Sequence, residues 1–578
     1  LGIGLSLVAV PSGYSCSRAE RFFVGFSAGY GLLAYLIYLI GLTIGFNRPV
    51  VLVVIAAAAA LAARGLYLFL GADLKQNVSR LKSTFENREA VVLALWTAFF
   101  LTLLILGSFL PPSAHDALCY HLSIPGRWAG DGIIGYYPHL VNSLFPFLIQ
   151  IYYGIGILFK VDYAAHFFHL GCLIGTLAGT FALARRFSGN WASWVSVLIL
   201  VSTPGIFNQA NLPLNDIALM FFSFAMLYAV YLGVENGFSR RFFIIAGMLG
   251  GFAMGIKYFA ALHILSAAAG ALFFAVKQKV KPLRVLEIIG LFGLFAFLFG
   301  GVWYIRSWAL DGNPVYPYFS NVFGRGSDIG YDLEKQGFGK SLWDLLLSPW
   351  RAVLYPRNFG GTWSQIGIVY LIFLPFAFFK SHGQKIIFWK VSALAYFLCW
   401  FFLVQNLRFL YFILPVLAVL ISFYARTYRW ILYLALLLNT FFAVYHSKEV
   451  FVFLKNRESR SAYLSRTDST YSAIQKINQI IPENEKVLVS DHIRLYYFNA
   501  EPVRADEFFK RQRTNWTDPM LVKKMAEQKI YWISATREIY ESLRSLHEIK
   551  RSEWISQEAV ILYLKPDSAD SSSSEQEK

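Results

Sequence analysis

The stretch VVLALWTAFFLTLLILGSFLPPSAHDALCYHLSIPGRW, residues 91–128, contains both kinds of segment from which this chain is built. Its first half is apolar as far as Leu110 and is long enough to cross about 30 Å of hydrocarbon as a helix. Its second half places Asp116, Tyr120 and His121 soon after that helix ends. An apolar span followed directly by polar, titratable residues predicts a functional site at a membrane surface.

The composition of the whole chain supports a membrane protein. The 578 residues are 56% hydrophobic and only 15% charged, which is too apolar for a soluble protein of several domains. The formal net charge of +17 is spread over short basic clusters between apolar runs, a pattern typical of cytoplasmic loops, so we expect no nucleic-acid partner. The cysteines have no paired spacing and predict neither a zinc site nor a disulfide framework: Cys16, Cys119, Cys172 and Cys399.

Hydropathy predicts an α-helical polytopic membrane protein with about thirteen transmembrane helices. The apolar run 143–159 contains Pro and Gly and is shorter, so we assign it to the outer surface as an interfacial or re-entrant segment. The predicted spans are 22–46, 48–70, 89–110, 164–186, 191–207, 213–233, 242–259, 260–276, 285–308, 364–380, 386–404, 407–424 and 428–446.

The basic clusters orient these spans, because Lys and Arg are enriched in cytoplasmic loops. Thirteen spans put all six clusters on the cytoplasmic side, and a crossing at 143–159 would separate the first two. The clusters are Lys75/Arg80/Lys82/Arg88, Arg185/Arg186, Arg240/Arg241, Lys277/Lys279/Lys281/Arg284, Lys380/Lys385 and Arg426/Arg429. The outer segments are then 111–163, 204–213, 309–363, 405–408 and everything after 447.

The composition changes after Tyr445, and residues 447–565 predict a small extracytoplasmic α/β domain. TYSAIQKINQII predicts a helix, and the strand candidates are KVLVS, RLYYF, KIYWIS and AVILYL. The polar, low-complexity tail 566–578 is expected to be disordered. We therefore divide the chain into accessory transmembrane helices at 1–88, a main transmembrane domain at 89–446, the α/β domain and the tail.

Two carboxylates fall at the outer ends of predicted spans. Asp116 follows the span 89–110, and Asp216 lies near the start of the span 213–233. A charged group at the edge of the hydrocarbon is costly unless it is paired or used. The alternative is that each residue caps a helix, since Asp is a favoured N-cap residue.

Three cations also fall at outer ends of spans, away from the cytoplasmic clusters: Lys257, Arg306 and Arg408. Each could extend to lipid headgroups along its own aliphatic stem. Together they indicate an anionic ligand, most simply a phosphate. Two carboxylates with a cationic phosphate site fit the transfer of a sugar from a lipid-linked phosphate to a hydroxyl. An Asp would accept the proton of the acceptor hydroxyl, and Lys and Arg would stabilise the departing phosphate.

Several stretches together resemble the GT-C superfamily of polytopic glycosyltransferases, in particular the bacterial branch similar to protein O-mannosyltransferases and lipid A aminoarabinose transferases. They are HDALCYHLSIPGRWAGDG, ALARRFSGNWASWVSVLILVSTP, NDIALMFFSFAMLY, GMLGGFAMGIKY, DGNPVYPYF and LRFLYFILP. The likeness covers roughly residues 89–424. By this resemblance residues 89–446 form a GT-C-like glycosyltransferase domain with interfacial helices in its first outer loop.

The resemblance also implies roles for residues. Asp116 matches the catalytic base of the first outer loop. Asp216 matches the second acidic position, where it would take part in catalysis by orienting the acceptor or holding a cation. Lys257, Arg306 and Arg408 match positions near the donor phosphate. We expect Tyr120 and His121 to orient the base or the acceptor. The family often carries an acidic neighbour beside the first acid, whereas here Asp116 is flanked by His115 and Ala117. Metal dependence is therefore left open, with a divalent cation as the one cofactor to consider.

The expected partners are a polyprenyl-phosphate sugar donor, membrane lipid, and an acceptor that is a lipid, a glycan or a protein. The expected location is a bacterial inner membrane, with the site and the C-terminal domain facing the periplasm. Alternatives are an O-antigen-ligase-like transferase with a diphosphate-linked donor and a transporter or flippase for lipid-linked sugars. A further alternative is a zinc site on one helical face, formed by Asp162, His166 and His169.

Overall fold

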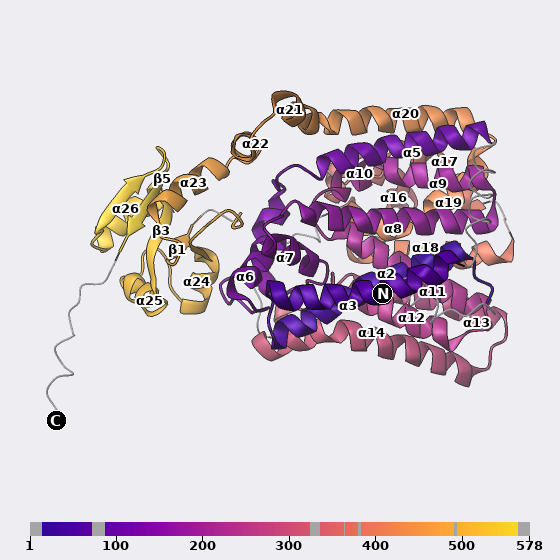
Figure 1. Ribbon diagram of the computed structural model, residues 1–578, viewed down its shortest axis with the longest axis horizontal. Helices are drawn as coiled ribbons and strands as arrows, with labels where there is room; N and C mark the ends of the chain where they lie inside the picture. The colour runs from indigo at the N-terminus through magenta and orange to yellow at the C-terminus, as the bar shows by residue number, and fades with distance from the viewer. Residues whose placement is uncertain are drawn as a thin grey trace. The chain divides into compact units, whose positions relative to one another are not determined.

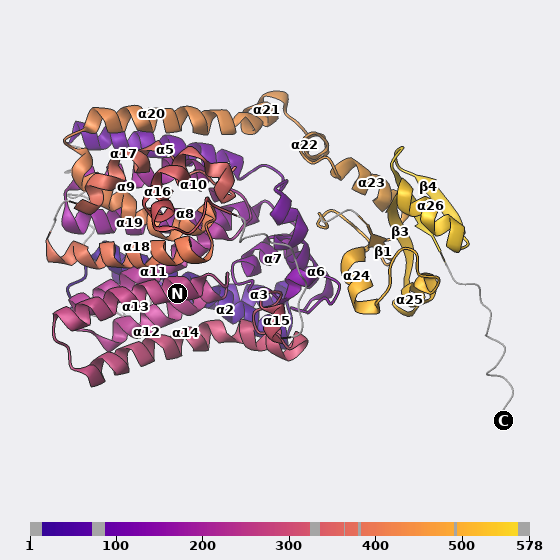
Figure 2. The ribbon, with the colours of Figure 1, turned by 180° about the vertical axis from the view of Figure 1, so that it is seen from behind.

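The computed structural model describes residues 14–71, 87–323, 336–362, 364–379, 383–490 and 494–564. The chain divides into two units (Figures 1 and 2). The first unit comprises residues 1–110, 128–134 and 144–456, and the second comprises 111–127, 135–143 and 457–578. The predicted disordered tail at 566–578 and the basic residues Lys75, Arg80, Lys82 and Lys380 lie outside the described residues.

The first unit is helical, and its helices run side by side with α14 along one edge and α20 along the opposite edge (Figures 1 and 2). Its helices up to α14 are α2 (Arg18–Thr43), α3 (Arg48–Gly71), α5 (Arg88–Gly107), α7 (Gln150–Leu158), α8 (Ala164–Phe187), α9 (Asn190–Ser202), α10 (Pro204–Ala210), α11 (Asp216–Glu235), α12 (Arg240–Met254), α13 (Ala260–Lys277) and α14 (Pro282–Asp311). Its later helices are α15 (Ser320–Phe323), α16 (Leu342–Leu354), η4 (Pro356–Phe359), α17 (Ile368–Phe379), α18 (Gln384–Leu403), η5 (Leu407–Ile413), α19 (Leu414–Ala425), α20 (Arg429–His446) and α21 (Lys448–Asn456). The segment between α5 and α7 contains η1 (Ala117–His121), α6 (Ser123–Asp131) and η2 (Val141–Leu144).

These helices make the chain an integral membrane protein, but the predicted number of spans is not confirmed. Within the described residues, 8 helices are long and apolar enough to cross a membrane, or up to 10 if each of two bent pairs counts as one span. Helices α12 and α17 have only 15 and 12 residues, and α9 and α10 meet at a 69° bend. The apolar run 143–159 forms the nine-residue helix α7, which is too short to cross the hydrocarbon.

Helix α11 lies at the centre of the first unit. Every residue from Asp216 to Val234 is buried. A helix that is apolar on all sides lies either within a protein core or in the lipid of a membrane. Here α2, α8, α12 and α13 pack around it. The carboxylate of Asp216, the first residue of α11, is consequently held at the end of the most enclosed helix of the unit.

Helices α12 and α14 pack with almost no space between their backbones. A Cβ atom added to Gly247 would come within 2.5 Å of the Phe292 carbonyl oxygen, and one added to Gly251 within 2.7 Å of the Ala296 oxygen. Small residues four positions apart allow this close approach between membrane helices. The contact fixes the position of α12, and therefore of the short connection after it, which carries Lys257.

The second unit contains a five-stranded sheet of order β2-β1-β3-β5-β4. Strands β2, β1 and β3 are parallel, and β5 pairs antiparallel with both β3 and β4. Leu488, Val503, Ile533, Val560 and Leu562 from these strands lie in its hydrophobic core. The elements are α22 (Arg460–Thr467), α23 (Tyr471–Ile480), β1 (Lys486–Val489), β2 (Glu501–Arg504), α24 (Ala505–Gln512), α25 (Leu521–Glu527), β3 (Ile530–Thr536), α26 (Arg537–Leu546), β4 (Arg551–Trp554) and β5 (Ala559–Tyr563).

The predicted α/β character of the C-terminal region is confirmed, with one wrong strand. The stretches KVLVS, KIYWIS and AVILYL correspond to β1, β3 and β5, and TYSAIQKINQII to α23. RLYYF, residues 494–498, is not a strand but part of the loop that precedes β2. Its aromatic residues have high strand propensity, but here tertiary contacts outside the sheet hold them. The second unit also includes 111–127 and 135–143 from the segment after α5, which the sequence-based division into domains did not group with it.

Candidate active site

Asp216 forms the centre of a cluster of charges in the first unit. Lys257 Nζ lies 2.7 Å from Asp216 Oδ1, and it also donates to Asn215 Oδ1 at 3.4 Å. An Arg408 terminal guanidinium nitrogen lies 3.8 Å from the other carboxylate oxygen, Oδ2. Three elements far apart in the sequence thus bring together one carboxylate and two of the three predicted phosphate-binding cations.

Local structure explains how each side chain reaches the cluster. Asp216 begins α11, and Lys257 lies in the connection between α12 and α13. Arg408 lies in η5, where the side chain of Asn406 accepts a hydrogen bond from the Arg408 backbone N–H at 3.0 Å. The Lys257 ammonium also lies 5.2 Å from the centre of the Phe409 ring, a cation–π distance. Residues 406–409 therefore orient both cations.

The burial of the three charges is unequal. The side chain of Asp216 is 2% exposed, whereas those of Lys257 and Arg408 are 22% and 31% exposed. The carboxylate forms the buried side of the cluster and the cations its more accessible side. One negative and two positive charges leave the cluster cationic, which favours an anionic group such as a phosphate.

These contacts decide two of the alternatives left by the sequence. Asp216 is the first helical residue after the N-cap, Asn215, and its carboxylate pairs with cations. It is therefore not a simple helix cap. Lys257 and Arg408 pair with this buried carboxylate, so extension toward lipid headgroups does not account for their positions.

Arg306 is the third predicted phosphate-binding cation. It lies near the C-terminal end of α14 and interacts electrostatically with the hydroxyls of Tyr38 and Tyr258. Tyr258 directly follows Lys257, and its own hydroxyl donates to the Tyr316 carbonyl at 2.9 Å. The ion pairs that define the cluster are those of Lys257 and Arg408.

Asp116, Tyr120 and His121 lie in the second unit, around the π-helical turn η1. Asp116 occupies the N-cap position with helical backbone angles and makes no side-chain capping hydrogen bond, so the capping alternative fails for this residue too. His121 is buried, and its ring centre lies 4.1 Å from that of Tyr120. Burial, followed by the charge of Asp116, raises the pKa of the neighbouring Cys119 thiol to about 12.

The alternative zinc site is not supported. His166 Nδ1 bonds to the carbonyl oxygen of Asn211, and His169 Nδ1 lies 3.2 Å from that of Gln209. Among the residues that the structure describes, no group of three or more His, Cys, Asp or Glu side chains is arranged to hold a metal ion. Asp162 lies in the turn before α8 and so does not share a helical face with the two histidines, whose imidazoles instead hydrogen-bond to the backbone near α10.

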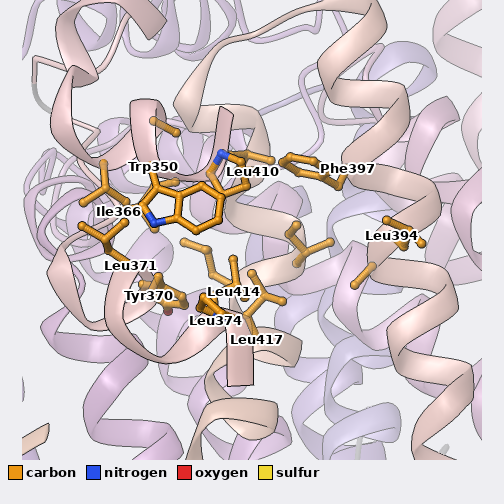
Figure 3. A pocket seen from close by; sticks show the side chains of 16 residues that line it. Trp350, Ile366, Tyr370, Leu371, Leu374, Leu394, Phe397, Leu410, Leu414 and Leu417 are labelled. Atoms are coloured by element: carbon orange, nitrogen blue, oxygen red, sulfur yellow. The ribbon is translucent and has the colours of Figure 1, made fainter. Parts of the chain in front are cut away.

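An apolar cavity of about 240 Å³ lies beside η5 (Figure 3). Leu410 and Ile413 of η5 line it, together with Trp350 of α16, Leu374 of α17 and Leu414 of α19. Figure 3 shows the indole of Trp350 among these aliphatic side chains. Helix η5 thus contributes Arg408 to the charge cluster and apolar side chains to the cavity.

Sequence reasoning missed Asn215 and Phe409 as members of the site. Each is adjacent in sequence to a predicted site residue: Asn215 precedes Asp216, and Phe409 follows Arg408. A polar residue beside a buried acid and an aromatic residue beside a cation are weak signals in a chain with 53 Phe residues. Only the folded arrangement shows that both contact Lys257.

The fold and the family comparison agree on the class of protein. Residues 144–303 match the family model described as dolichyl-phosphate-mannose-protein mannosyltransferase. This match includes Asp216 and Lys257. The fold is that of polytopic GT-C glycosyltransferases, so the resemblance seen in the sequence is confirmed at the level of the fold.

Particular solved structures are similar to this chain. The crystal structure of ArnT from Cupriavidus metallidurans bound to undecaprenyl phosphate aligns with a TM-score of 0.51 at 12% identity, over 81% of this chain and 97% of that chain. Its apo state aligns with a TM-score of 0.52 at 13% identity over the same shares, 81% and 97%. The Archaeoglobus fulgidus oligosaccharyltransferase in complex with Zn and sulfate aligns with a TM-score of 0.46 at 14% identity, over 79% and 70% of the two chains. No curated protein sequence matches this chain significantly.

Proposed function

We propose that this protein is a membrane glycosyltransferase that moves a sugar from a polyprenyl-phosphate donor to a hydroxyl group of an acceptor. The observation that carries the proposal is the cationic cluster of Asp216, Lys257 and Arg408, together with an apolar cavity lined by residues of η5, the short helix that also carries Arg408. A lipid phosphate needs both features, positive charge for its head and apolar surface for its chain. The matched family is described by a lipid-phosphate sugar donor, and one similar structure contains undecaprenyl phosphate, which supports this donor class.

In the proposed reaction, Asp116 accepts the proton of the acceptor hydroxyl as its oxygen attacks the anomeric carbon. The bond from that carbon to the donor phosphate breaks, and the phosphate leaves with the electron pair. Lys257 and Arg408 stabilise its charge, with Arg306 nearby. Asp216 keeps the two cations in place. Tyr120 and His121 orient the base or the acceptor.

We place the reaction on the extracytoplasmic face of a bacterial inner membrane, following the distribution of basic residues in the sequence. The acceptor is a lipid, a glycan or a protein. We assign Asp216 the role of counter-ion rather than metal ligand, because Lys257 and Arg408 approach its two oxygens.

The direct test is turnover by the purified protein in nanodiscs. A polyprenyl-monophosphate sugar should be consumed with release of polyprenyl phosphate, and EDTA should leave the rate unchanged. Turnover only with a diphosphate-linked donor would favour the O-antigen-ligase-like alternative. Movement of intact donor between leaflets without release of polyprenyl phosphate would identify a flippase. If EDTA abolished turnover and Mg²⁺ or Mn²⁺ restored it, the reaction would depend on a divalent cation bound at the site.

The cavity beside η5 gives a second prediction. Leu374→Trp places an indole in the space proposed for the polyprenyl chain. We expect KM to rise about tenfold for a long-chain donor, because a few buried methylene groups lose their contacts at about 0.8 kcal/mol each. KM for a donor with a short prenyl chain should stay unchanged. The matched control is Leu294→Trp, since Leu294 is exposed on α14 and lines no part of this cavity. If KM changed equally for the long-chain and the short-chain donor, the cavity would not be the binding site of the polyprenyl chain.

A further inference from the structure

The loop RLYYF of the second unit binds the segment that contains Asp116. The backbone N–H groups of Leu495 and Tyr496 both donate to the Leu118 carbonyl oxygen, at 3.0 Å and 3.1 Å. The Tyr497 hydroxyl donates to the Pro112 carbonyl oxygen at 2.6 Å. Residues on both sides of Asp116 are therefore tied to one loop of the C-terminal region.

The π-helical form of η1 makes the Leu118 carbonyl accessible to this loop. In an α-helix the N–H of Leu122 would donate to the Leu118 oxygen. Here it donates to Ala117 instead, at 2.9 Å. Leu118 then accepts from Leu495 and Tyr496, two residues more than 370 positions later in the chain. Single π-helical turns of this kind occur frequently at functional sites.

Arg494 adds a charged link beside Asp116. Its guanidinium lies 2.5 Å from Oδ1 of Asp468, whose side chain is 0% exposed, and its Nε donates to His115 Nδ1 at 3.1 Å. The same Asp468 oxygen accepts from the Thr470 backbone N–H and hydroxyl, which fixes the carboxylate. A planar guanidinium can bridge two partners at fixed angles in a way that an ammonium cannot.

The loop is itself held firmly by the C-terminal domain. The Asn478 side chain on α23 donates to the Tyr497 carbonyl at 2.9 Å, and the ring of Tyr471 on the same helix packs edge-on against the Tyr497 ring, with centroids 5.2 Å apart. The position of residues 112–118 is thus coupled to α23 through Tyr497. An accessory domain with no role in positioning residues 112–118 would need none of these contacts.

We propose that the C-terminal domain serves as the platform for the catalytic base, with Arg494 as the positioning residue that connects buried Asp468 to His115 beside Asp116. This inference rests on the proposed function for its catalytic consequence. Arg494 does not touch the reacting atoms. It holds the turn η1, whose geometry determines the position of the Asp116 carboxylate.

The first test measures the turn itself and is independent of catalysis. Cys119 lies within η1, and burial raises the pKa of its thiol to about 12, so we expect slow alkylation by iodoacetamide in the native protein. Arg494→Ala should increase the alkylation rate of Cys119, measured by peptide mass spectrometry, by about tenfold or more, because the turn opens more often. This increase should exceed the opposing effect of losing the Arg494 charge, which lowers the Cys119 pKa. Tyr497→Phe keeps the ring and removes one hydrogen bond, and should give a smaller increase. Arg551→Ala is the matched control, since Arg551 pairs with Glu553 on β4.

The second test measures turnover. Arg494→Ala should lower kcat about tenfold to a hundredfold through misplacement of the base, with the donor KM unchanged. Arg494→Lys, which retains the charge, should recover part of kcat. If the alkylation rate of Cys119 were unchanged in both Arg494→Ala and Tyr497→Phe, the proposal that the C-terminal domain holds the η1 turn would be wrong. Faster alkylation with unchanged kcat would overturn the positioning role. If Asp116→Asn proves fully active while alkylation still rises, the platform stands and the assignment of the base fails.

Discussion

Asp116→Asn is expected to lose about two to four orders of magnitude in sugar transfer, the usual contribution of a positioned base. Asn keeps the size and shape of the side chain and removes its basicity. The residue is partly buried and makes no capping hydrogen bond, so the substitution should leave η1 folded. Donor binding should also remain, because the proposed phosphate contacts come from Lys257 and Arg408.

The measurement is release of polyprenyl phosphate by the purified variant in nanodiscs, alongside donor binding. Asp131→Asn is the matched control, since Asp131 is an exposed carboxylate of the same segment between α5 and α7 and should keep the wild-type rate. If Asp116→Asn turned over the donor at the wild-type rate, Asp116 would not be the catalytic base. Rescue of the Asn variant by an external base such as azide or formate would support the assigned role directly.

Asp216→Asn is expected to lower the free energy of unfolding by about 3 to 5 kcal/mol, because it leaves two cations beside the buried start of α11 without their counter-charge. Removal of one cation as well, in Asp216→Asn/Lys257→Gln, should restore a large part of this stability. The double variant should still use donor poorly, since a phosphate contact is lost. The two readouts are the unfolding temperature in detergent and the donor KM.

Glu287→Gln provides the comparison for this experiment. Glu287 pairs with Arg240 and Arg284 on the same unit, but its side chain is 33% exposed. An exposed pair contributes about 0 to 1 kcal/mol, so little change is expected. Equal stability losses for Asp216→Asn and Glu287→Gln would contradict the buried-counter-ion role. A double variant no more stable than Asp216→Asn would show that the two charges are not coupled.

Hydropathy and periodicity predicted the elements well, because each depends on neighbours in the chain. A run of apolar residues must form a helix to satisfy its backbone in hydrocarbon, and this determined the positions of α2, α5, α8, α11 and α14. Alternating apolar residues bounded by turn signals determined β1, β3 and β5. The number of complete crossings was less predictable, since it depends on helix lengths and bends that hydropathy alone does not report.

The sequence by itself thus determined a helical membrane protein with a C-terminal α/β domain, and it identified Asp216, Lys257 and Arg408 as chemically unusual. Only the tertiary structure decided that these three charges meet, because their contacts join positions more than 40 and more than 190 residues apart. It also decided that RLYYF is a loop bound to residues 112–118 rather than a strand. Local propensity describes how a segment folds against itself, whereas the Leu118 carbonyl obtains its hydrogen bonds from a distant part of the chain, and no local pattern encodes that pairing.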